Sequence, residues 1–353
     1  MEFREGELIE QRLLQQKLFK RMEWFKDISV SAPLLEYQIF DKNIPILNIE
    51  HCGDHQYLYR LPKPSEIEKF AYDLHDQLSD KLKRKMNPME IKISIETWIR
   101  DALLRAGVCK HNNLDEDVMR FIKNYDDIIL SPDTNILLDC VVTSVLLPRI
   151  KEKIDEDIKG CPNWILIAIP KLVMNEVERK AIRRYRRDDF SAKVGWPSLD
   201  GRIGQRALQE ILELDTNVNY KGVSIMTVGE IPQAFDSFKE DQTRWDAEIR
   251  FQIKDFISRI SFHKGAFFLT QDRINAMMAR AEGIQSLYLQ KPEYEELIGK
   301  EMQNEDAGRV LYELAVTFGE INIKGICKLS IFWPEKHVSD WENSRVMINS
   351  TMI

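Results

Sequence analysis

The chain has 353 residues, of which 44% are hydrophobic and 30% charged, and its formal net charge is −7 at pH 7. This composition is that of an ordinary globular protein with enough apolar residues for more than one core, and the length predicts two or three folding units. The negative net charge excludes a general attraction to nucleic acids, so any such binding requires a local basic patch.

Membrane and secretory signals are missing from the sequence. It contains no run of about 18 apolar residues, so no segment is expected to span a membrane, and its first residues, MEFREGE, do not form a signal peptide. The cysteines are scattered, odd in number and without a Cys-x-x-Cys pair, which predicts reduced thiols and a cytoplasmic location. They are Cys52, Cys109, Cys140, Cys161 and Cys327.

Residues 1–125 are expected to form a mostly helical accessory domain with a small β element. The predicted elements are a helix over residues 7–26, strands over 44–49 and 56–61, and helices over 65–82, 89–106 and 114–125. The sequence Ser65-Glu66-Ile67-Glu68 has the pattern of a capping box that opens the second of these helices, residues 65–82.

From residue 126 to residue 292, strands alternate with helices. Strands are predicted over residues 128–131, 164–170, 223–228, 266–270 and 286–289, and helices over 136–145, 172–185, 244–260 and 273–282. Repeated βα units of this kind predict an α/β fold whose parallel sheet has helices on both faces. The remaining residues, 293–353, are expected to add a C-terminal extension of one helix and a β-hairpin.

Four acidic residues follow four of the predicted strands: Asp133, Glu176, Asp246 and Asp272. Open α/β sheets place their ligands at the carboxyl ends of the strands, so these acids are expected to reach one common edge. A cluster of like charges is unfavourable unless a cation neutralises it, and Mg²⁺ and Mn²⁺ prefer carboxylate oxygens. The pattern therefore predicts a metal site suited to phosphodiester hydrolysis.

Each acid also has a structural explanation that the sequence leaves open. Asp133 and Asp272 stand where helix caps stand, and Glu176 alone would be a solvated helix residue. Asp246 competes with Asp241 and Glu248 for its place in the site. A further acid, Asp139, lies two turns along the first helix of this region and is expected either to support the residues of the site or to be structural.

A dense basic run follows Glu176 directly, and we interpret it as a nucleic-acid-binding patch because cations without interleaved acids repel one another unless phosphates neutralise them. Its members are Arg179, Lys180, Arg183, Arg184, Arg186 and Arg187. The aromatic residues Tyr185 and Trp196 nearby either stack on bases or pack against the protein.

The four acidic segments together resemble the motifs of PIN-domain nucleases over residues 126–290. Ser131-Pro132-Asp133-Thr134-Asn135 is similar to the first motif, and Ile169-Pro170 followed by Glu176 is similar to the second. Asp246-Ala247-Glu248-Ile249 resembles the third, and the run from Phe268 to Arg273 resembles the fourth.

The resemblance implies a three-layer α/β/α fold and an endoribonuclease that uses Mg²⁺ or Mn²⁺ to hydrolyse RNA. DNA stays open as an alternative substrate, and a homodimer is a common assembly of such domains. It implies that Asp133, Glu176, Asp246 and Asp272 hold the metal, and that Thr134 or Asn135, and Thr270, orient water or a carboxylate. The 70 residues between Glu176 and Asp246 exceed the spacing of compact family members and imply an insertion.

The sequence offers two alternative functions and one alternative metal site. A catalytically silent module of the same fold would bind RNA or a protein through the same surfaces. A phosphatase of the haloacid dehalogenase type requires an Asp-x-Asp after the first strand, where this chain has Asn135. A zinc site at His51, Cys52 and His55 lacks a second ligand pair, so packing is the preferred explanation there.

Overall fold

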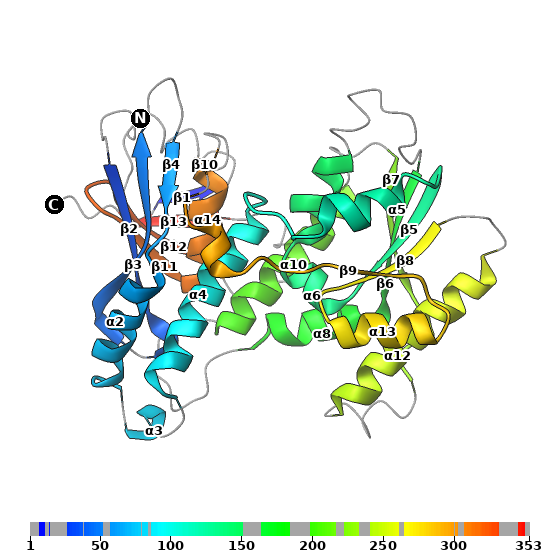
Figure 1. Cartoon of the computed structure of the whole chain (residues 1–353), viewed down its shortest axis with the longest axis horizontal. Coiled ribbons are helices and arrows are strands. Elements are labelled where there is room, and N and C mark those ends of the chain that lie inside the picture. The colour runs from blue at the N-terminus through cyan, green and yellow to red at the C-terminus, as the bar shows by residue number, and fades with distance from the viewer. Residues whose placement is uncertain are drawn as a thin grey trace. The chain divides into compact units, whose positions relative to one another are not determined.

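Figure 1 shows the computed structural model of the chain. The structure describes residues 7–10, 14, 27–37, 39–51, 57–78, 80–83, 86–150, 164–183, 198–216, 222–232, 241–260, 265–299, 301–302, 307–331 and 345–349. The chain divides into two compact units, which we call unit 1 (Met1–Cys109, Arg183–Ile203 and Pro292–Ile353) and unit 2 (Lys110–Ile182 and Gly204–Lys291). None of the described helices is long and apolar enough to cross a membrane.

Unit 1 is built on an antiparallel sheet. In spatial order the described strands are β1 (Glu7–Glu10), β13 (Arg345–Asn349), β12 (Cys327–Ile331), β11 (Glu320–Ile323), β2 (Asp27–Leu34), β3 (Ile39–His51), β4 (Tyr57–Arg60) and β10 (Glu301–Met302). The two ends of the chain share this sheet, since Glu7 pairs with Ile348 and Val30 pairs with Ile323.

This pairing corrects the expected domain division. The accessory domain of residues 1–125 and the extension of residues 293–353 are not separate pieces, because strands from both belong to one sheet. The helix expected over residues 7–26 is wrong at its start, where Glu7–Glu10 is a strand. The strand has the sequence Glu-Leu-Ile-Glu, which is too short for hydrophobic periodicity to distinguish a strand from a helix.

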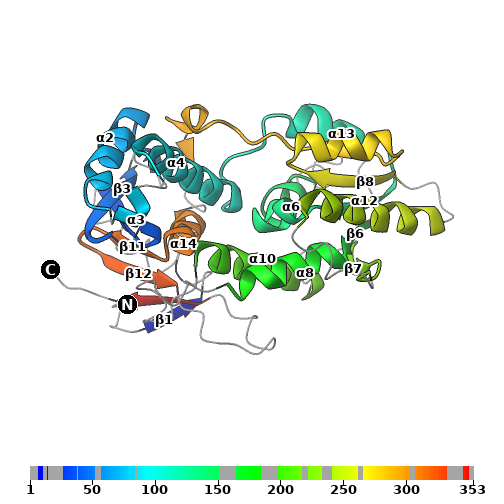
Figure 2. The ribbon, with the colours of Figure 1, turned by 90° about the horizontal axis from the view of Figure 1, so that it is seen from below.

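Three longer helices of unit 1 pack together beside this sheet (Figures 1 and 2): α2 (Pro64–His75), α4 (Pro88–Arg105) and α14 (Ala307–Phe318). Helix α4 begins with a capping box, in which Asn87 Oδ1 accepts from the Glu90 amide and Glu90 accepts from the Asn87 amide. In α2 the expected box is displaced by two residues, because the carboxylate that reaches back is that of Glu66, to the amide of Lys63.

A buried arginine closes the C-terminal end of α14. Arg202, which is 1% exposed, donates its Nε–H to the Val316 carbonyl at 2.8 Å and Nη2 to the Thr317 carbonyl at 2.7 Å. Its Nη2 also lies 3.3 Å from Glu36 Oε1. The last carbonyls of a helix have no intrahelical partner and carry partial negative charge, so a guanidinium satisfies both needs at once.

Unit 2 is built on a parallel sheet with the strand order β7 (Val223–Val228), β6 (Trp164–Pro170), β5 (Asp127–Pro132), β8 (Gly265–Thr270) and β9 (Ser286–Tyr288). All four strand pairings are parallel. The predicted α/β class and the five strands of this region are therefore confirmed. Strand β5 has neighbours on both sides and is apolar almost throughout, as a strand buried on both faces must be.

The described helical segments of unit 2 are η2 (Leu114–Val118), α5 (Met119–Ile122), α6 (Thr134–Leu138), η3 (Val142–Leu146), α8 (Lys171–Ala181), α10 (Leu199–Thr216, from Gly204 onward), α12 (Gln242–Arg259) and α13 (Arg273–Ala281). The helix expected over residues 136–145 is interrupted at Cys140, whose φ of 51° is left-handed. This conformation is costly for a residue with a Cβ, and it ends α6 before η3 begins. Gly204 lets α10 approach α8 closely, because a Cβ there would meet the Ala181 nitrogen at 2.4 Å.

A carboxylate is buried between α10 and η3. Glu210 Oε1 accepts from both the amide and the hydroxyl of Thr143, each at 2.9 Å. Burial raises the pKa of Glu210 to about 8, so this side chain is mostly protonated at neutral pH.

Replacing Arg202 by methionine is expected to destabilise the protein by about 3–5 kcal/mol, because the Val316 and Thr317 carbonyls and Glu36 would lose a buried charged donor. Urea denaturation followed by circular dichroism measures the change. Arg60→Met is the matched control, since Arg60 is 59% exposed and pairs with Glu50 at the surface. The control is expected to cost less than about 1 kcal/mol, and an equal loss in both variants would contradict the capping role.

Candidate functional site

The carboxyl end of β5 delivers Asp133 to the point where the chain connections leave the sheet in opposite directions. The next strand along the chain, β6, lies on one side of β5, and β8 lies on the other. Such a switch point is where open α/β sheets bind their ligands. Asp133 is also the N-cap of α6, with Oδ1 accepting from the Thr134 amide at 2.8 Å, and its own amide donates to the Leu269 carbonyl at the end of β8.

The second carboxylate oxygen of Asp133 is held by two side-chain donors. Oδ2 accepts from the hydroxyl of Thr270 at 2.7 Å and from Nδ2 of Asn275 at 3.2 Å. The Thr270 hydroxyl oxygen itself accepts from the Asp272 amide at 3.0 Å, so its single proton is directed at Asp133. Thr270 thus contacts the Asp133 carboxylate, and its predicted orienting role stays a prediction.

Thr134 connects Asp133 to a second predicted acid. Its amide binds Asp133, and its hydroxyl donates to Glu176 Oε2 at 2.6 Å. Glu176 projects from α8, the helix that follows β6. Of the two residues proposed for this role, Thr134 makes the contact, whereas Asn135 is exposed to solvent.

A third acid acts on Asp133 through space. Burial raises the pKa of Asp133 to about 6, the hydrogen bonds from Thr270 and Thr134 partly offset this, and the charges of Asp246 and Glu176 raise it further. The structure therefore brings Asp133, Glu176 and Asp246 within electrostatic reach of one another. Asp246 is half-buried in α12, the helix that follows β7.

The rivals of Asp246 have other positions. Asp241 caps α12, where its Oδ1 accepts from the Thr243 and Arg244 amides. Glu248 lies on the wall of a separate cavity. Asp246 is accordingly the acid of this helix whose charge bears on Asp133.

Asp272 has the capping role that the sequence left open. Its Oδ1 accepts from the Ile274 amide at 2.7 Å and from the Asn275 amide at 3.1 Å, at the start of α13, and its side chain is exposed. Its part as a fourth metal ligand stays a prediction.

The donors at this edge fit a hard divalent cation in their chemistry, because they are carboxylate and hydroxyl oxygens. Within the described ranges, however, no three His, Cys, Asp or Glu side chains are arranged to hold an ion between them. Mg²⁺ usually keeps several waters and binds proteins through one or two carboxylates plus substrate phosphates. A hydrated ion at Asp133 and one neighbouring acid suits these residues, while a closed cage of four carboxylates does not.

Two further residues of this site, Asn275 and Arg250, are not among those predicted. Nη1 of Arg250 donates to Oδ1 of Asn275 at 2.6 Å, and Nε of Arg250 donates to the Glu282 carboxylate at 3.0 Å. Both are buried. The sequence could have indicated both residues by their spacing. Arg250 lies four residues after Asp246, and Asn275 lies three after Asp272, so each is on the same helix face as a predicted acid.

The basic run is only partly described. Arg179 lies over the ring of Trp245, with its Cζ 5.6 Å from the ring centroid, and Arg183 pairs with Asp200 at 2.6 Å. These two cations therefore have partners within the protein, an aromatic ring for Arg179 and an acid from outside the run for Arg183. Lys180 is half-buried. Arg184, Arg186, Arg187, Tyr185 and Trp196 lie outside the described residues, as do Cys52 and His55.

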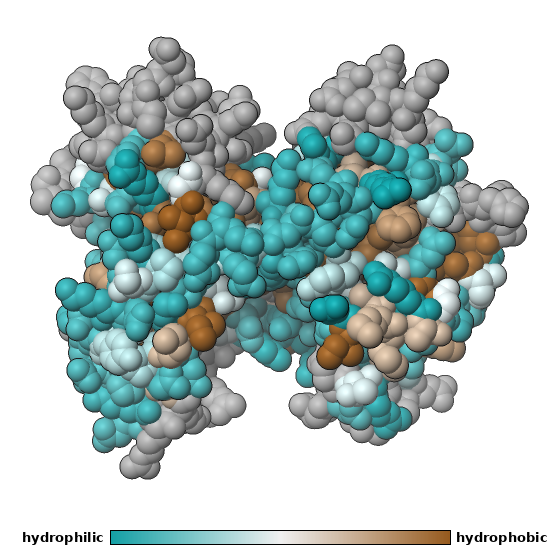
Figure 3. All heavy atoms as spheres, in the orientation of Figure 1, coloured by the Kyte–Doolittle hydropathy of each residue, from teal (hydrophilic) through white to brown (hydrophobic). Residues whose placement is uncertain are grey.

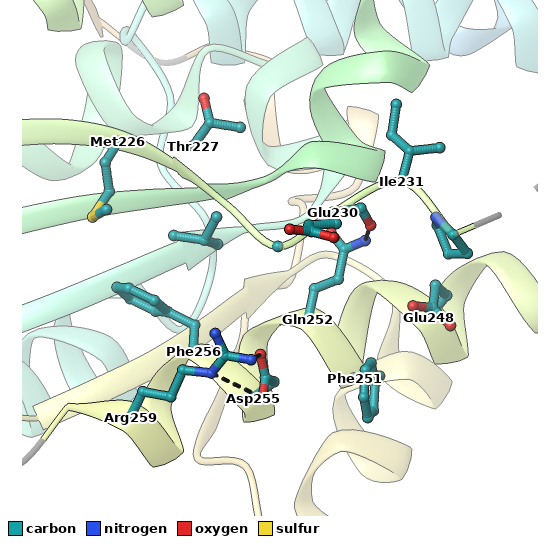
Figure 4. A pocket seen from close by; sticks show the side chains of 13 residues that line it. Met226, Thr227, Glu230, Ile231, Glu248, Phe251, Gln252, Asp255, Phe256 and Arg259 are labelled. Carbon is teal, nitrogen blue, oxygen red and sulfur yellow. Dashed lines mark hydrogen bonds and ion pairs between the residues drawn. The ribbon is translucent and has the colours of Figure 1, made fainter.

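A cavity of about 520 Å³ lies at the carboxyl end of β7, against α12 (Figure 4). Its walls combine apolar side chains with carboxylates, and one of these, Asp255, pairs with Arg259 at 2.8 Å. The wall residues with large exposed apolar side chains are Met226, Ile231 and Phe251, and the other acids are Glu230 and Glu248. The excess of negative charge makes this cavity unsuited to a phosphate.

No protein-family model and no curated protein matches the sequence. One solved structure, a domain of a functionally unknown protein from Methanocaldococcus jannaschii DSM 2661, is similar over 47% of this chain and 93% of that chain, with 24% sequence identity and a TM-score of 0.31. A TM-score of this size does not support a fold assignment, so the fold description rests on the elements given above.

Asp133→Asn is expected to stabilise the metal-free protein increasingly as the pH rises. Because the pKa of Asp133 is raised from 3.8 to about 6 on folding, its contribution to stability is fully present below pH 3.8 and is lost as the pH rises through about 6. A shift of this size corresponds to about 3 kcal/mol at neutral pH, as an upper bound. The measurement is the difference in unfolding free energy between wild type and variant in EDTA, at pH 4, 5, 6 and 7.

The control for this experiment is Asp255→Asn, which removes a surface acid of α12 paired with Arg259. A difference between wild type and Asp133→Asn that stays constant from pH 4 to pH 7 would contradict the raised pKa.

Proposed function

We propose that this chain is a metal-dependent endoribonuclease of PIN type, with a three-layer α/β/α arrangement in unit 2. The observation that carries the proposal is the position of Asp133. It is a buried carboxylate at the tip of the central parallel strand, and two further acids from later βα units raise its pKa. Such a concentration of negative charge at a switch point is typical of cation-dependent sites.

Each residue of the cluster has a separable task in this proposal. Asp133 and its neighbours Glu176 and Asp246 would hold Mg²⁺ or Mn²⁺, with Asp272 as the fourth predicted ligand. The bound ion would supply an activated water and charge stabilisation at the scissile phosphate. Thr134 keeps Asp133 and Glu176 in fixed relation through its amide and hydroxyl, and Thr270 fixes the rotation of the Asp133 carboxylate.

The basic run supports a nucleic-acid substrate, with RNA preferred over DNA by the family resemblance. Lys180 and the three arginines outside the described residues, Arg184, Arg186 and Arg187, would bind phosphates. Arg179 and Arg183 have protein partners with which a substrate would have to compete. The described free cysteines, Cys109, Cys140 and Cys327, are buried, which agrees with the cytoplasmic location that we propose. A homodimer is a further expectation.

A second candidate is a catalytically silent module of the same fold that binds a protein partner. Two observations favour it. No three metal-binding side chains are grouped around an ion site in the described part of the chain. In addition, Ile274, Met277 and Met278 expose an apolar stripe on α13, a region of the surface where Figure 3 shows apolar side chains among hydrophilic ones. Exposed apolar patches on helices commonly mark protein-binding surfaces.

Incubating the full chain with labelled RNA and DNA, with and without Mn²⁺, separates these functions. We expect Mn²⁺-dependent cleavage of RNA by the wild type and a loss of at least about 100-fold in Asp133→Asn, because the variant lacks the buried charged ligand. Asp255→Asn is the control and is expected to cleave as the wild type does.

Full activity in Asp133→Asn would overturn the nuclease assignment. Binding of RNA or protein without cleavage in any metal, by the wild type and by Asp133→Asn alike, would favour the silent module instead.

A further inference from the structure

The two oxygens of the Asp133 carboxylate are not equivalent. Oδ2 accepts two hydrogen bonds, from Thr270 and from Asn275. Oδ1 accepts one, from the Thr134 amide. Because a carboxylate oxygen has two lone-pair positions, Oδ2 is saturated and Oδ1 retains one acceptor site.

From this asymmetry we infer that Asn275, held by Arg250, is a positioning residue that anchors Oδ2 of Asp133 and leaves Oδ1 as the oxygen that binds the divalent cation. The inference rests on the proposed function, since it concerns the same metal site.

The orientation of the Asn275 amide follows from its other partner. Arg250 has only donors, and its Nη1 lies 2.6 Å from Oδ1 of Asn275. A flipped amide would place its NH₂ group against the guanidinium and its carbonyl against the Asp133 carboxylate, so that both contacts would be repulsive. Arg250 therefore ensures that the amide presents a donor to Asp133.

Arg250 is itself immobilised. Its Nε donates to both oxygens of Glu282, at 3.1 and 3.0 Å, and the residue is 5% exposed. Asn275 and Glu282 stand seven residues apart, so they share one face of α13 and its C-cap, two turns from each other. Arg250 spans this distance from α12, which links two helices to the single oxygen Oδ2.

The role of the anchor is to prevent rotation of the carboxylate. Without Asn275, Oδ2 would be held by Thr270 alone. The carboxylate could then rotate, and its two oxygens would exchange between Thr134, Thr270 and the cation. Outer partners of metal ligands act in this way, and their removal typically lowers metal affinity by about 10- to 100-fold.

The test is a double-mutant cycle on Mn²⁺ affinity in the full chain without nucleic acid. Isothermal titration calorimetry gives the Kd, and the electron paramagnetic resonance spectrum of bound Mn²⁺ reports its ligand field. We expect Asn275→Ala and Arg250→Met each to weaken Mn²⁺ binding by about 10- to 100-fold. We expect Arg250→Met to have no further effect on the Kd in the Asn275→Ala background, because Arg250 acts through Asn275.

Two variants guard against a general loss of structure. Arg250→Lys keeps a cationic donor for Oδ1 of Asn275 and is expected to restore most of the affinity that Arg250→Met loses. Asn124→Ala makes the same substitution at an exposed site of unit 2 and is expected to leave the Kd unchanged.

The outcomes separate this inference from the function beneath it. If the wild type binds Mn²⁺ and Asn275→Ala binds it equally well, the positioning role is wrong while the metal site stands. If Arg250→Met and Asn275→Ala weaken binding additively, Arg250 does not act through the amide. A wild type that binds no Mn²⁺, with Asp133→Asn giving the same result, overturns the metal site and this inference together.

Discussion

The organisation of unit 2 depends on β5 having parallel partners on both sides. Pairing with β6 and β8 buries β5 on both edges and both faces, which is why its residues are almost all apolar. It also forces the residue after the strand, Asp133, into an environment that water hardly reaches. The raised pKa of Asp133 is a direct consequence of this topology, since burial is its largest cause. A surface aspartate in the same sequence motif would have an ordinary helix-capping role only.

Burying an acid beside other acids is unfavourable, and the surrounding residues reduce that cost without removing it. Asp133 receives three hydrogen bonds, from an amide, a hydroxyl and a side-chain amide. Glu210, a second buried acid of unit 2, also receives two hydrogen bonds, yet its pKa rises further, to about 8. Two buried carboxylates in one unit thus differ in charge at neutral pH. Asp133 is mostly ionised and can bind a cation, whereas Glu210 is mostly neutral and serves packing.

The strands of unit 2 could be predicted because their signal is local. Trp164–Pro170 and Val223–Val228 have the predicted bounds, and the acids that follow the strands could be ordered along one edge of the sheet. The antiparallel sheet of unit 1 could not be predicted in the same way. Two of its pairings, β1 with β13 and β2 with β11, join residues from opposite ends of the chain, such as Glu7 with Ile348, and no window of sequence contains both partners. No strand is predicted over Asp27–Leu34 either, although its apolar residues Ile28, Val30, Ala32 and Leu34 alternate with the others. Pro33 counts against a strand, because proline cannot donate to the ladder.

The same difference between local signals and contacts distant in sequence applies to the residues of the site. Thr270 is the last residue of its strand, and its place at the sheet edge could be inferred from position, whereas the contacts of Asn275 and Arg250 depend on how α13 and α12 face each other. To choose Asp246 over Asp241 and Glu248, one must likewise know at which residue α12 begins, because the start of a helix determines the direction of every later side chain. Asp241 caps α12, and the side chain five positions later, Asp246, then lies on the face near Asp133. Sequence periodicity can predict the contacts of such residues only when the first residue of both helices is known. A cap displaced by one residue rotates every side chain on the helix by about 100°. The positions of Asp246 on α12 and of Asn275 on α13 therefore depend on two helix caps, Asp241 and Asp272.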